Sequence, residues 1–391
     1  MPEQPHYRIL LVHCRYRLPG GEDAVFEAER AMLQAHGHEV ITYERSNAEG
    51  GALQKLLLPF RAVFSFKTLR QVRALIRRHH IDVVHVHNTL LVISPSVFWA
   101  CFREGVPVVQ TLHNFRLFCP NGVLLRQGRV CEDCPRQGAA CAVRHACYRD
   151  SQPLSALVAA VYGLHRAAGT FRGVTLLTPT EFDRRKLVEF NRLCPTFDED
   201  RLFVKPNPVT IADPGEVPVK NQLLYAGRLE ELKGLRTVLE AWKLLGDDAP
   251  RLVVAGSGPL EGWARDNATP QVEFVGRLTR AGLHHAMAES RAVVAASLCY
   301  ESFALVPAEA HALGVPVLAS DLGNVGEAVT EGFNGLHFAP GDAAALAQAV
   351  RRLKTVRFDR TAIRAEAAIR ISPEENYQTL MQIYRAAGAN P

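Results

Sequence analysis

Short apolar runs alternate with helix-length segments from one end of the chain to the other, and this alternation constrains the fold more than any other feature. The runs Ile-Leu-Leu-Val at 9–12 and Arg-Leu-Val-Val at 251–254 lack polar alternation, as expected when helices cover both faces of a sheet. Strand–helix–strand repetition predicts βαβ units around parallel sheets, and therefore an α/β fold. The predicted strands cover residues 8–13, 39–43, 82–87, 107–112, 174–178, 202–205, 222–226, 251–255, 272–275, 292–296, 316–319 and 335–338.

The chain has 391 residues, which is too long for one domain of the usual ~150 residues and predicts two to three domains, two large ones being the simplest case. The strand pattern restarts after the segment Pro206-Asn207-Pro208. We therefore expect a Rossmann-like N-terminal domain over 1–205 and a second doubly wound domain over 206–372. The last helical segment, 373–391, follows the strands of the second domain and is expected to pack back on the first.

Charge is distributed unevenly between these two halves. The composition, 48% hydrophobic and 22% charged, excludes disordered, collagen-like and coiled-coil classes. The net charge of +5 divides into +8 for residues 1–205 and −3 for the rest of the chain. The first half is therefore the one expected to meet an acidic or membrane-borne partner.

No apolar run approaches the ~20 residues of a membrane span, and the first apolar stretch is too short for a signal peptide. The nine cysteines are an odd number without an export signal, so we expect a cytoplasmic chain with mostly reduced thiols. Residues 53–80 combine apolar side chains with arginines and lysines. Such a segment indicates either peripheral docking on the anionic inner membrane surface or an ordinary helix pair with a solvated cationic face.

Five cysteines lie within the short segment 119–147 and form the Cys-rich loop of the first domain. Cys131 and Cys134 form a C-x2-C pair, and four thiolates of the loop would complete a tetrahedral structural zinc site. Cys141 or His145 would be able to replace one ligand, and free thiols or a redox pair are the alternative to zinc. The favoured ligands are Cys119, Cys131, Cys134 and Cys147.

Two motifs have the chemistry of an anion site. Gly20 and Gly21 follow the first predicted strand and precede a helix, where backbone amides and the helix dipole favour an anion. Arg228 and Lys233 flank a turn after the strand at 222–226 and would suit a diphosphate. The alternatives are a tight turn without a ligand at the glycines and solvated surface charge at the two cations.

Two glutamates, Glu301 and Glu309, bracket the segment Ser-Phe-Ala-Leu-Val-Pro-Ala at 302–308. Glu309 lies on a helical segment that looks largely buried, and a buried carboxylate is costly without a partner. A pair of ribose hydroxyls would be such a partner, and a local backbone contact is the alternative.

With these motifs the chain resembles the family-4 glycosyltransferases, which have the GT-B fold of two Rossmann-like domains facing across a cleft. The motifs follow the family's order over most of the chain. They are Gly20-Gly21-Glu22, Asp-Val-Val-His-Val-His-Asn at 82–88, Thr-Leu-His-Asn at 111–114, Pro-Asn-Pro-Val at 206–209, Gly-Arg-Leu at 227–229 with Lys233-Gly234, Gly-Ser-Gly-Pro at 256–259, Glu301 with Glu309, and Gly-Val-Pro-Val at 314–317.

The resemblance implies a retaining transfer of a sugar from a nucleoside diphosphate donor. Arg228 and Lys233 would neutralise the diphosphate, and Glu309 would hold the ribose. Glu301 would contact hydroxyls of the transferred sugar and His113 would lie at its other edge, so these two are the expected catalytic residues. Fixed cations would stabilise the departing diphosphate, so no cofactor or metal is expected in catalysis.

Backbone amides complete the implied donor site, at Gly20 and Gly21 and in the turn of Phe303, Ala304 and Leu305. Many family members have glycine in place of Ala304, which puts the contact of that amide in doubt unless φ stays negative. The segment Asp198-Glu199-Asp200 has the D-x-D pattern of a metal site but is interpreted as a solvated acidic turn. Gly256-x-Gly258 lacks the third glycine of a dinucleotide fingerprint, and at least one of His85 and His87 is interpreted as a satisfied core histidine.

The predicted function is therefore synthesis of a glycan, polysaccharide or glycolipid from a nucleoside diphosphate sugar and a glycan or lipid-linked acceptor. Nucleic acid is not an expected partner. The alternatives are a nucleotide-sugar epimerase or phosphorylase of the same fold, and a non-catalytic protein that binds nucleotide sugars.

Overall fold

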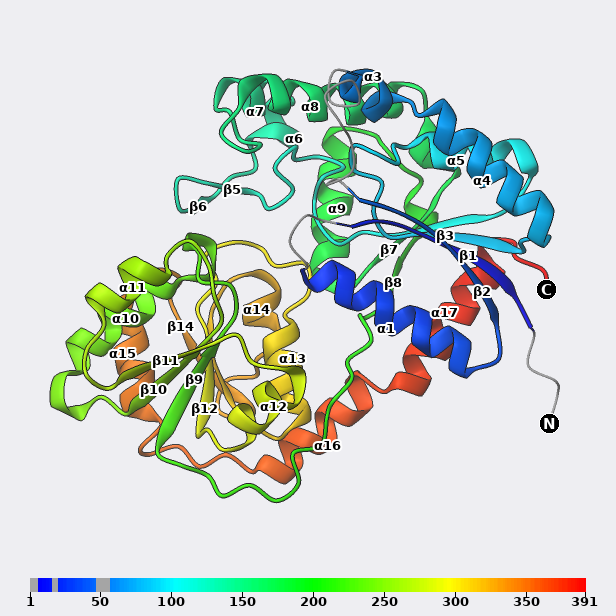
Figure 1. Cartoon of the computed structure of the whole chain (residues 1–391). Coiled ribbons are helices and arrows are strands. Elements are labelled where there is room, and N and C mark those ends of the chain that lie inside the picture. Colours follow the sequence, from blue (N-terminus) through cyan, green and yellow to red (C-terminus); the bar gives the residue numbers. More distant parts are fainter. Residues whose placement is uncertain (1–5, 16–19, 47–56) are drawn as a thin grey trace. The chain divides into compact units, whose positions relative to one another are not determined.

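The structure is a computed structural model that describes residues 6–15, 20–46 and 57–391. It consists of two compact units (Figure 1). The first unit comprises Met1–Val123, Glu132–Pro208 and Pro373–Pro391, and the second comprises Leu124–Cys131 and Val209–Ser372. The main crossing between them thus falls three residues after the predicted boundary at 205, and the C-terminal segment belongs to the first unit.

The first unit is built on a parallel sheet in the order β2-β1-β3-β4-β7-β8. Its strands are β1 (Arg8–Arg15), β2 (Glu39–Ser46), β3 (Val83–Val86), β4 (Val108–Thr111), β7 (Thr175–Thr178) and β8 (Leu202–Val204). Its α-helices are α1 (Gly21–Ala35), α3 (Leu58–Val63), α4 (Phe66–His79), α5 (Ser96–Glu104), α6 (Asp133–Gln137), α7 (Ala140–Arg144), α8 (Gln152–Ala167), α9 (Glu181–Leu193) and α17 (Pro373–Ala386).

The second unit has the strand order β11-β10-β9-β12-β13-β14, again all parallel. Its strands are β9 (Gln222–Ala226), β10 (Arg251–Ala255), β11 (Val272–Gly276), β12 (Ala292–Ala295), β13 (Val317–Ser320) and β14 (Gly335–Phe338). Its α-helices are α10 (Leu235–Leu245), α11 (Glu261–Asn267), α12 (Arg280–Ala288), α13 (Leu305–Ala312), α14 (Gly323–Glu327), α15 (Ala343–Arg352) and α16 (Arg360–Arg370).

All twelve predicted strands are present, three of them with the predicted bounds. The hairpin of β5 (Leu125–Arg126) and β6 (Arg129–Val130) was not predicted from the sequence. Its turn residues Gln127 and Gly128 have φ values of 50° and 73°, the left-handed conformation that tight hairpins require. Strands of two residues are too short to produce a hydrophobic period, which is why the pattern did not predict them.

Each unit has its own hydrophobic core, formed by apolar side chains that pack on its sheet. In the second unit Trp242 is fully buried, and its indole N–H donates to the Pro250 carbonyl at 2.8 Å. In the first unit α17 contributes Tyr377, Leu380 and Tyr384 to the core that contains Ile9. The C-terminal helix is therefore part of the hydrophobic core of the first unit.

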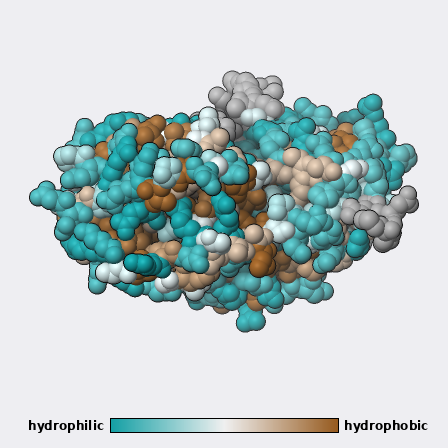
Figure 2. Space-filling model, turned by 90° about the horizontal axis from the view of Figure 1, so that it is seen from below, coloured by the Kyte–Doolittle hydropathy of each residue, from teal (hydrophilic) through white to brown (hydrophobic). Residues whose placement is uncertain are grey.

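The surface is mainly hydrophilic, with separate hydrophobic patches on the face shown in Figure 2. Of the large apolar side chains that the structure describes, Ile369, Phe60 and Phe66 are the most exposed, with 79%, 76% and 71% of their surface accessible. Among the described residues no helix is both long and apolar enough to cross a membrane.

Candidate active site

The order of the strands explains where ligand-binding residues gather in the second unit. From β9 the chain adds β10 and β11 on one side, and then β12, β13 and β14 on the other, so the strand order reverses between β9 and β12. Ligands of doubly wound sheets bind at the carboxyl ends of the strands at such a point. Lys233 follows β9 and Glu301 follows β12. Both line one pocket with Tyr225, Ser297 and Pro307.

Lys233 and Glu301 form an ion pair, with 2.9 Å between Nζ and Oε1. Burial disfavours the charged ammonium, but the carboxylate outweighs burial and raises the pKa of Lys233. The Glu301 carboxylate also accepts from the Ser297 hydroxyl. Because Lys233 stays charged and partly exposed, it is suited to meet an anion in this pocket.

The backbone that carries Lys233 is held from two sides. The Tyr225 hydroxyl donates to the Lys233 carbonyl at 3.2 Å, and the Leu298 N–H donates to the Leu232 carbonyl at 2.9 Å. Gly234 adopts φ 69°, and a Cβ there would lie 1.9 Å from the Ala296 carbonyl oxygen. The glycine therefore lets the Lys233 turn approach the loop after β12.

The loops after β9 and β10 cross at similarly close range. A Cβ on Gly256 would lie 1.8 Å from the Gly227 carbonyl oxygen, and one on Gly258 would lie 2.4 Å from the Leu229 carbonyl oxygen. These glycines allow backbone to pass backbone, which agrees with the interpretation that Gly256-x-Gly258 is not a dinucleotide fingerprint.

The two remaining charged residues of the predicted donor site lie in different surroundings. Arg228 is 57% exposed in its side chain and lies 3.5 Å from the Glu230 carboxylate. Glu309 lies on α13, with 3.5 Å between its Oε1 and Nε2 of the buried His284. The Ala212 N–H donates to His284 Nδ1 at 2.9 Å, so Nδ1 is an acceptor and the N–H at Nε2 faces the carboxylate.

The turn of Phe303, Ala304 and Leu305 leads directly into α13. Ala304 has φ −79° and ψ 74°, so its methyl group fits the backbone without left-handed strain. The Leu305 N–H donates to the Phe303 carbonyl at 2.9 Å. The substitution of glycine by alanine therefore leaves the turn in an ordinary conformation.

In the first unit Gly20 and Gly21 lie at the start of α1; the preceding Leu18 and Pro19 lie outside the described residues. The Gly20 N–H donates to the Asp23 carboxylate at 2.8 Å, and the other Asp23 oxygen lies 2.9 Å from His13 Nε2. The Gly20 amide thus already has an acidic partner, which was not predicted from the sequence.

His113 follows β4 and lines a pocket of the first unit with His87, Asn88, Arg116 and Tyr162. Its Nε2 lies 3.1 Å from His87 Nδ1. Burial and the neighbouring His87 place the pKa of His113 well below its ordinary value, so the ring is neutral at pH 7. His85 is fully buried with partners at both ring nitrogens, as predicted for a core histidine.

The cysteine-rich loop brings several thiols of the first unit into one neighbourhood. Burial raises the pKa of Cys134 to about 12, and the nearby thiols of Cys119, Cys147 and Cys141 add to the shift. Cys131 belongs to the second unit, and its N–H donates to the Leu124 carbonyl at 2.7 Å. Asp198-Glu199-Asp200 is exposed ahead of β8, as expected for a solvated turn.

Family models match both halves of the chain. The model for Glycosyltransferase Family 4 matches residues 19–213, and the model for Glycosyl transferases group 1 matches residues 220–355. The chain belongs to glycosyltransferase family 4. Both sheets have the doubly wound topology of the GT-B fold, so the predicted two-domain GT-B fold is confirmed.

Two curated relatives each match about two fifths of the chain. A glycogen synthase of Mycobacterium tuberculosis is 38% identical over 180 residues, which is 42% of this chain and 42% of the relative. A phosphatidyl-myo-inositol mannosyltransferase of Mycobacterium leprae is 33% identical over 178 residues, 43% of this chain and 47% of the relative. The matched region therefore spans less than half the length of these relatives.

Solved structures share the whole architecture at low sequence identity. A glycosyltransferase from Rickettsia africae superimposes with a TM-score of 0.70 at 17% identity, over 99% of this chain and 100% of that one. Anabaena HepE in complex with UDP gives a TM-score of 0.66 at 16% identity, over 97% and 100%. At this identity the likeness supports the fold.

Proposed function

We propose that this family-4 chain transfers a sugar from a nucleoside diphosphate sugar to a glycan or lipid-linked acceptor, with retention of configuration and without a catalytic metal. The ion pair of Lys233 and Glu301 at the strand-order reversal carries this proposal. When the diphosphate leaves, negative charge builds on its oxygens, and Lys233 and Arg228 offset that charge. These side chains thereby supply the positive charge that a divalent ion provides elsewhere.

The other residues of the predicted donor site contact the ribose, the transferred sugar or the diphosphate. Glu309 accepts hydrogen bonds from the ribose hydroxyls, and Glu301 accepts from hydroxyls of the transferred sugar. His113 contacts the same sugar. Gly21 and the turn of 303–305 direct backbone amides to the diphosphate. HepE was solved with UDP and with UDP-glucose, which favours a uridine nucleotide as the first donor to test.

A donor screen followed by product analysis tests this function. Thermal denaturation with UDP-, GDP-, ADP- and TDP-sugars should show that one nucleotide raises the melting temperature. The protein should then transfer the sugar of the matching donor to an acceptor in the presence of EDTA, which removes divalent ions. NMR of the product should show the same anomeric configuration as in the donor. An inverted product or a strict need for a divalent ion would contradict the proposed mechanism. Donor breakdown without acceptor would favour the epimerase or phosphorylase, and binding without turnover would favour a non-catalytic protein.

The surface of α3 and α4 supports a membrane-borne acceptor. Phe60 and Phe66 are largely exposed beside Lys67 and Arg70, whereas residues 53–56 of the predicted segment lie outside the described residues. Two of the arginines in the segment 53–80 have a structural partner instead, because Arg73 and Arg77 both pair with Glu104, the Arg77 contact at 2.7 Å. We therefore assign the peripheral contact to the two aromatic rings and the remaining cations.

Replacing Phe60 and Phe66 by serine should reduce binding to vesicles that contain anionic phosphatidylglycerol by about tenfold, because two apolar side chains no longer enter the interface. Sedimentation with the vesicles at low salt measures the bound fraction. Ile369→Ser, which removes an equally exposed apolar side chain from the second unit, is the matched control. Absence of binding by the unaltered protein would remove the membrane proposal.

We also propose that Cys119, Cys131, Cys134 and Cys147 hold one structural zinc ion. Thiolates are the ligands that zinc prefers, and a loop with little core of its own gains stability from the metal. Metal analysis should find about one zinc per chain, and Cys134→Ser should lower that content. Cys194→Ser, at the end of α9, should leave it unchanged. A metal-free preparation with full stability would contradict the zinc site.

A further inference from the structure

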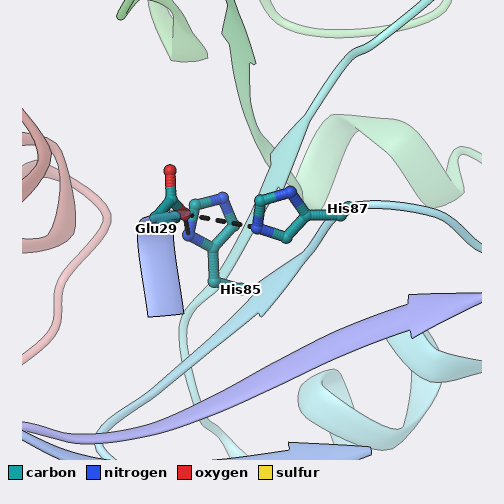
Figure 3. A group of neighbouring side chains, drawn as sticks. All are labelled: Glu29, His85 and His87. Carbon is teal, nitrogen blue, oxygen red and sulfur yellow. Dashed lines mark ion pairs between the residues drawn. The ribbon is translucent and has the colours of Figure 1, made fainter. Parts of the chain in front are cut away.

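A chain of buried polar side chains runs through the first unit from Lys205 to His113. Lys205 Nζ lies 2.8 Å from Glu29 Oε2, and the other carboxylate oxygen, Oε1, lies 3.3 Å from His87 Nε2. His87 Nδ1 lies 3.1 Å from His113 Nε2. Lys205, Glu29 and His87 are at most 3% exposed, and Figure 3 shows Glu29 beside His85 of β3 and His87, which directly follows β3.

The centre of this chain has the spacing of a metal site, but its charges are already balanced. The ligand atoms of Glu29, His85 and His87 lie within 4.8 Å of one another. The Lys205 ammonium occupies the second oxygen of the same carboxylate, and a metal ion there would be repelled by that charge. Lysine thus fills the role of the cation, and burial is compensated by pairing the two charges.

The two histidines of the chain are neutral. Burial lowers the pKa of His87 to about 4 despite the Glu29 carboxylate. The pKa of His113 is also far below its ordinary value because of burial and His87. A neutral imidazole carries one N–H and one bare nitrogen, so the direction of each hydrogen bond determines the tautomer of the next ring.

The carboxylate sets that direction. Glu29 Oε1 and His87 Nε2 are both buried, and neither makes a well-aligned hydrogen bond to another described atom. A bare nitrogen would place its lone pair against the anionic oxygen, so the proton of His87 lies on Nε2. His87 Nδ1 is then an acceptor, and the 3.1 Å contact requires that His113 donates its Nε2–H.

The side branch through His85 is consistent with this arrangement. His85 Nδ1 lies 2.9 Å from Glu29 Oε1 and 2.8 Å from the Tyr384 hydroxyl, and its Nε2 lies 2.8 Å from the Thr111 hydroxyl. A proton on Nδ1 faces the carboxylate, and Nε2 accepts from Thr111. His85 and His87 therefore both turn an N–H towards the same buried anion.

We propose that Lys205, Glu29 and His87 are positioning residues that hold His113 as the Nε2–H tautomer, so that His113 presents an unprotonated Nδ1 to a hydroxyl group of the donor sugar. The sugar contact rests on the proposed function, whereas the tautomer follows from the contacts within the first unit. The ring of His113 thereby discriminates in favour of a ligand group that donates a hydrogen bond.

Nitrogen-15 NMR of the full chain, labelled at histidine, tests the tautomer directly. Long-range ¹H–¹⁵N correlations distinguish a protonated from a bare ring nitrogen, and the variants His87→Gln and His113→Gln assign the signals. We expect a protonated Nε2 on both rings at pH 7. In the unaltered protein, a protonated Nδ1 on His113, or protons on both of its ring nitrogens, would overturn the proposal.

Reversing the chain should reverse the tautomer. In the double variant Glu29→Gln/Lys205→Met the charge pair is replaced by neutral groups, and the amide N–H of glutamine donates to His87 Nε2. His87 then donates from Nδ1, and the proton of His113 moves to its own Nδ1. Tyr384→Phe removes a hydroxyl from the His85 branch only and should leave His113 unchanged. An unchanged His113 in a folded double variant would contradict the role of Glu29.

The kinetic consequence distinguishes this inference from the proposed function. In the double variant kcat/KM for the donor should fall about tenfold, the value of one hydrogen bond, with most of the change in KM. With a donor analogue that lacks the contacted hydroxyl, the unaltered protein and the double variant should have the same kcat/KM. Absence of transfer by the unaltered protein would refute the proposed function and leave the tautomer result standing. An unchanged kcat/KM with a reversed tautomer would remove the sugar contact.

Discussion

Lys233→Ala should lower kcat of sugar transfer by about 10²–10³-fold, which is the usual loss when one fixed group that stabilises developing negative charge is removed. The ammonium group lies in a pocket at the strand-order reversal, and the Glu301 carboxylate beside it raises its pKa, so it is charged at every pH of interest. Its backbone is held by Tyr225, so the positive charge does not have to be brought into place during the reaction. Initial rates with a saturating donor measure the effect.

Two comparisons separate this effect from a loss of structure. Lys243→Ala removes an exposed lysine from α10 of the same unit and should retain full activity. The Glu301 carboxylate keeps its bond from the Ser297 hydroxyl in Lys233→Ala, so the melting temperature should change little. Full transfer activity in Lys233→Ala would refute the assignment of the diphosphate site.

Glu309→Ala should raise the KM for the donor by roughly ten- to hundredfold, because hydrogen bonds to a charged group contribute about 1.5–3 kcal/mol. The ribose hydroxyls are bound equally before and during transfer, so kcat should change much less than KM. Isothermal titration with the nucleoside diphosphate alone provides an independent measure, because that ligand still contains the ribose. The corresponding 2′,3′-dideoxy nucleotide should bind both proteins equally.

Glu240→Ala is the matched control for this experiment, since Glu240 is exposed on α10. Glu309→Gln keeps the size of the side chain and one acceptor oxygen, and should show an intermediate KM. The carboxylate also faces His284, so a lower melting temperature in Glu309→Ala would report that contact. Unchanged nucleotide affinity in a stable Glu309→Ala protein would show that the ribose is held elsewhere.

Much of this fold was predictable because buried parallel strands are continuous apolar runs. Residues 222–226, 251–255 and 335–338 were predicted with their observed bounds, since turn-forming residues flank each run: Asn221 and Gly227, Pro250 and Gly256, and Asn334 and Pro340. Strand order was a different matter. The hydrogen-bonded neighbours β9 and β12 are separated by two βα units along the chain, and no local pattern states that they pair.

The candidate site divides in the same way. Lys233 and Glu301 were named from a motif, but their 2.9 Å pairing depends on the close approach that Gly234 allows. Ser297 and Asp23 were missed, because a serine and an aspartate near strand ends have many structural uses. The only available signal for them was their position after a predicted strand.

Local sequence specified the strands, the restart of the pattern and the residue types of the anion site, because hydrophobic periodicity and turn chemistry act over a few neighbouring residues. The tertiary structure alone brought Lys205 to Glu29 and Glu29 to His87, across separations of up to 176 residues. The tautomer of His113 is a consequence of that assembly. A buried carboxylate can direct a proton only once folding has excluded water and left one hydrogen-bonding arrangement.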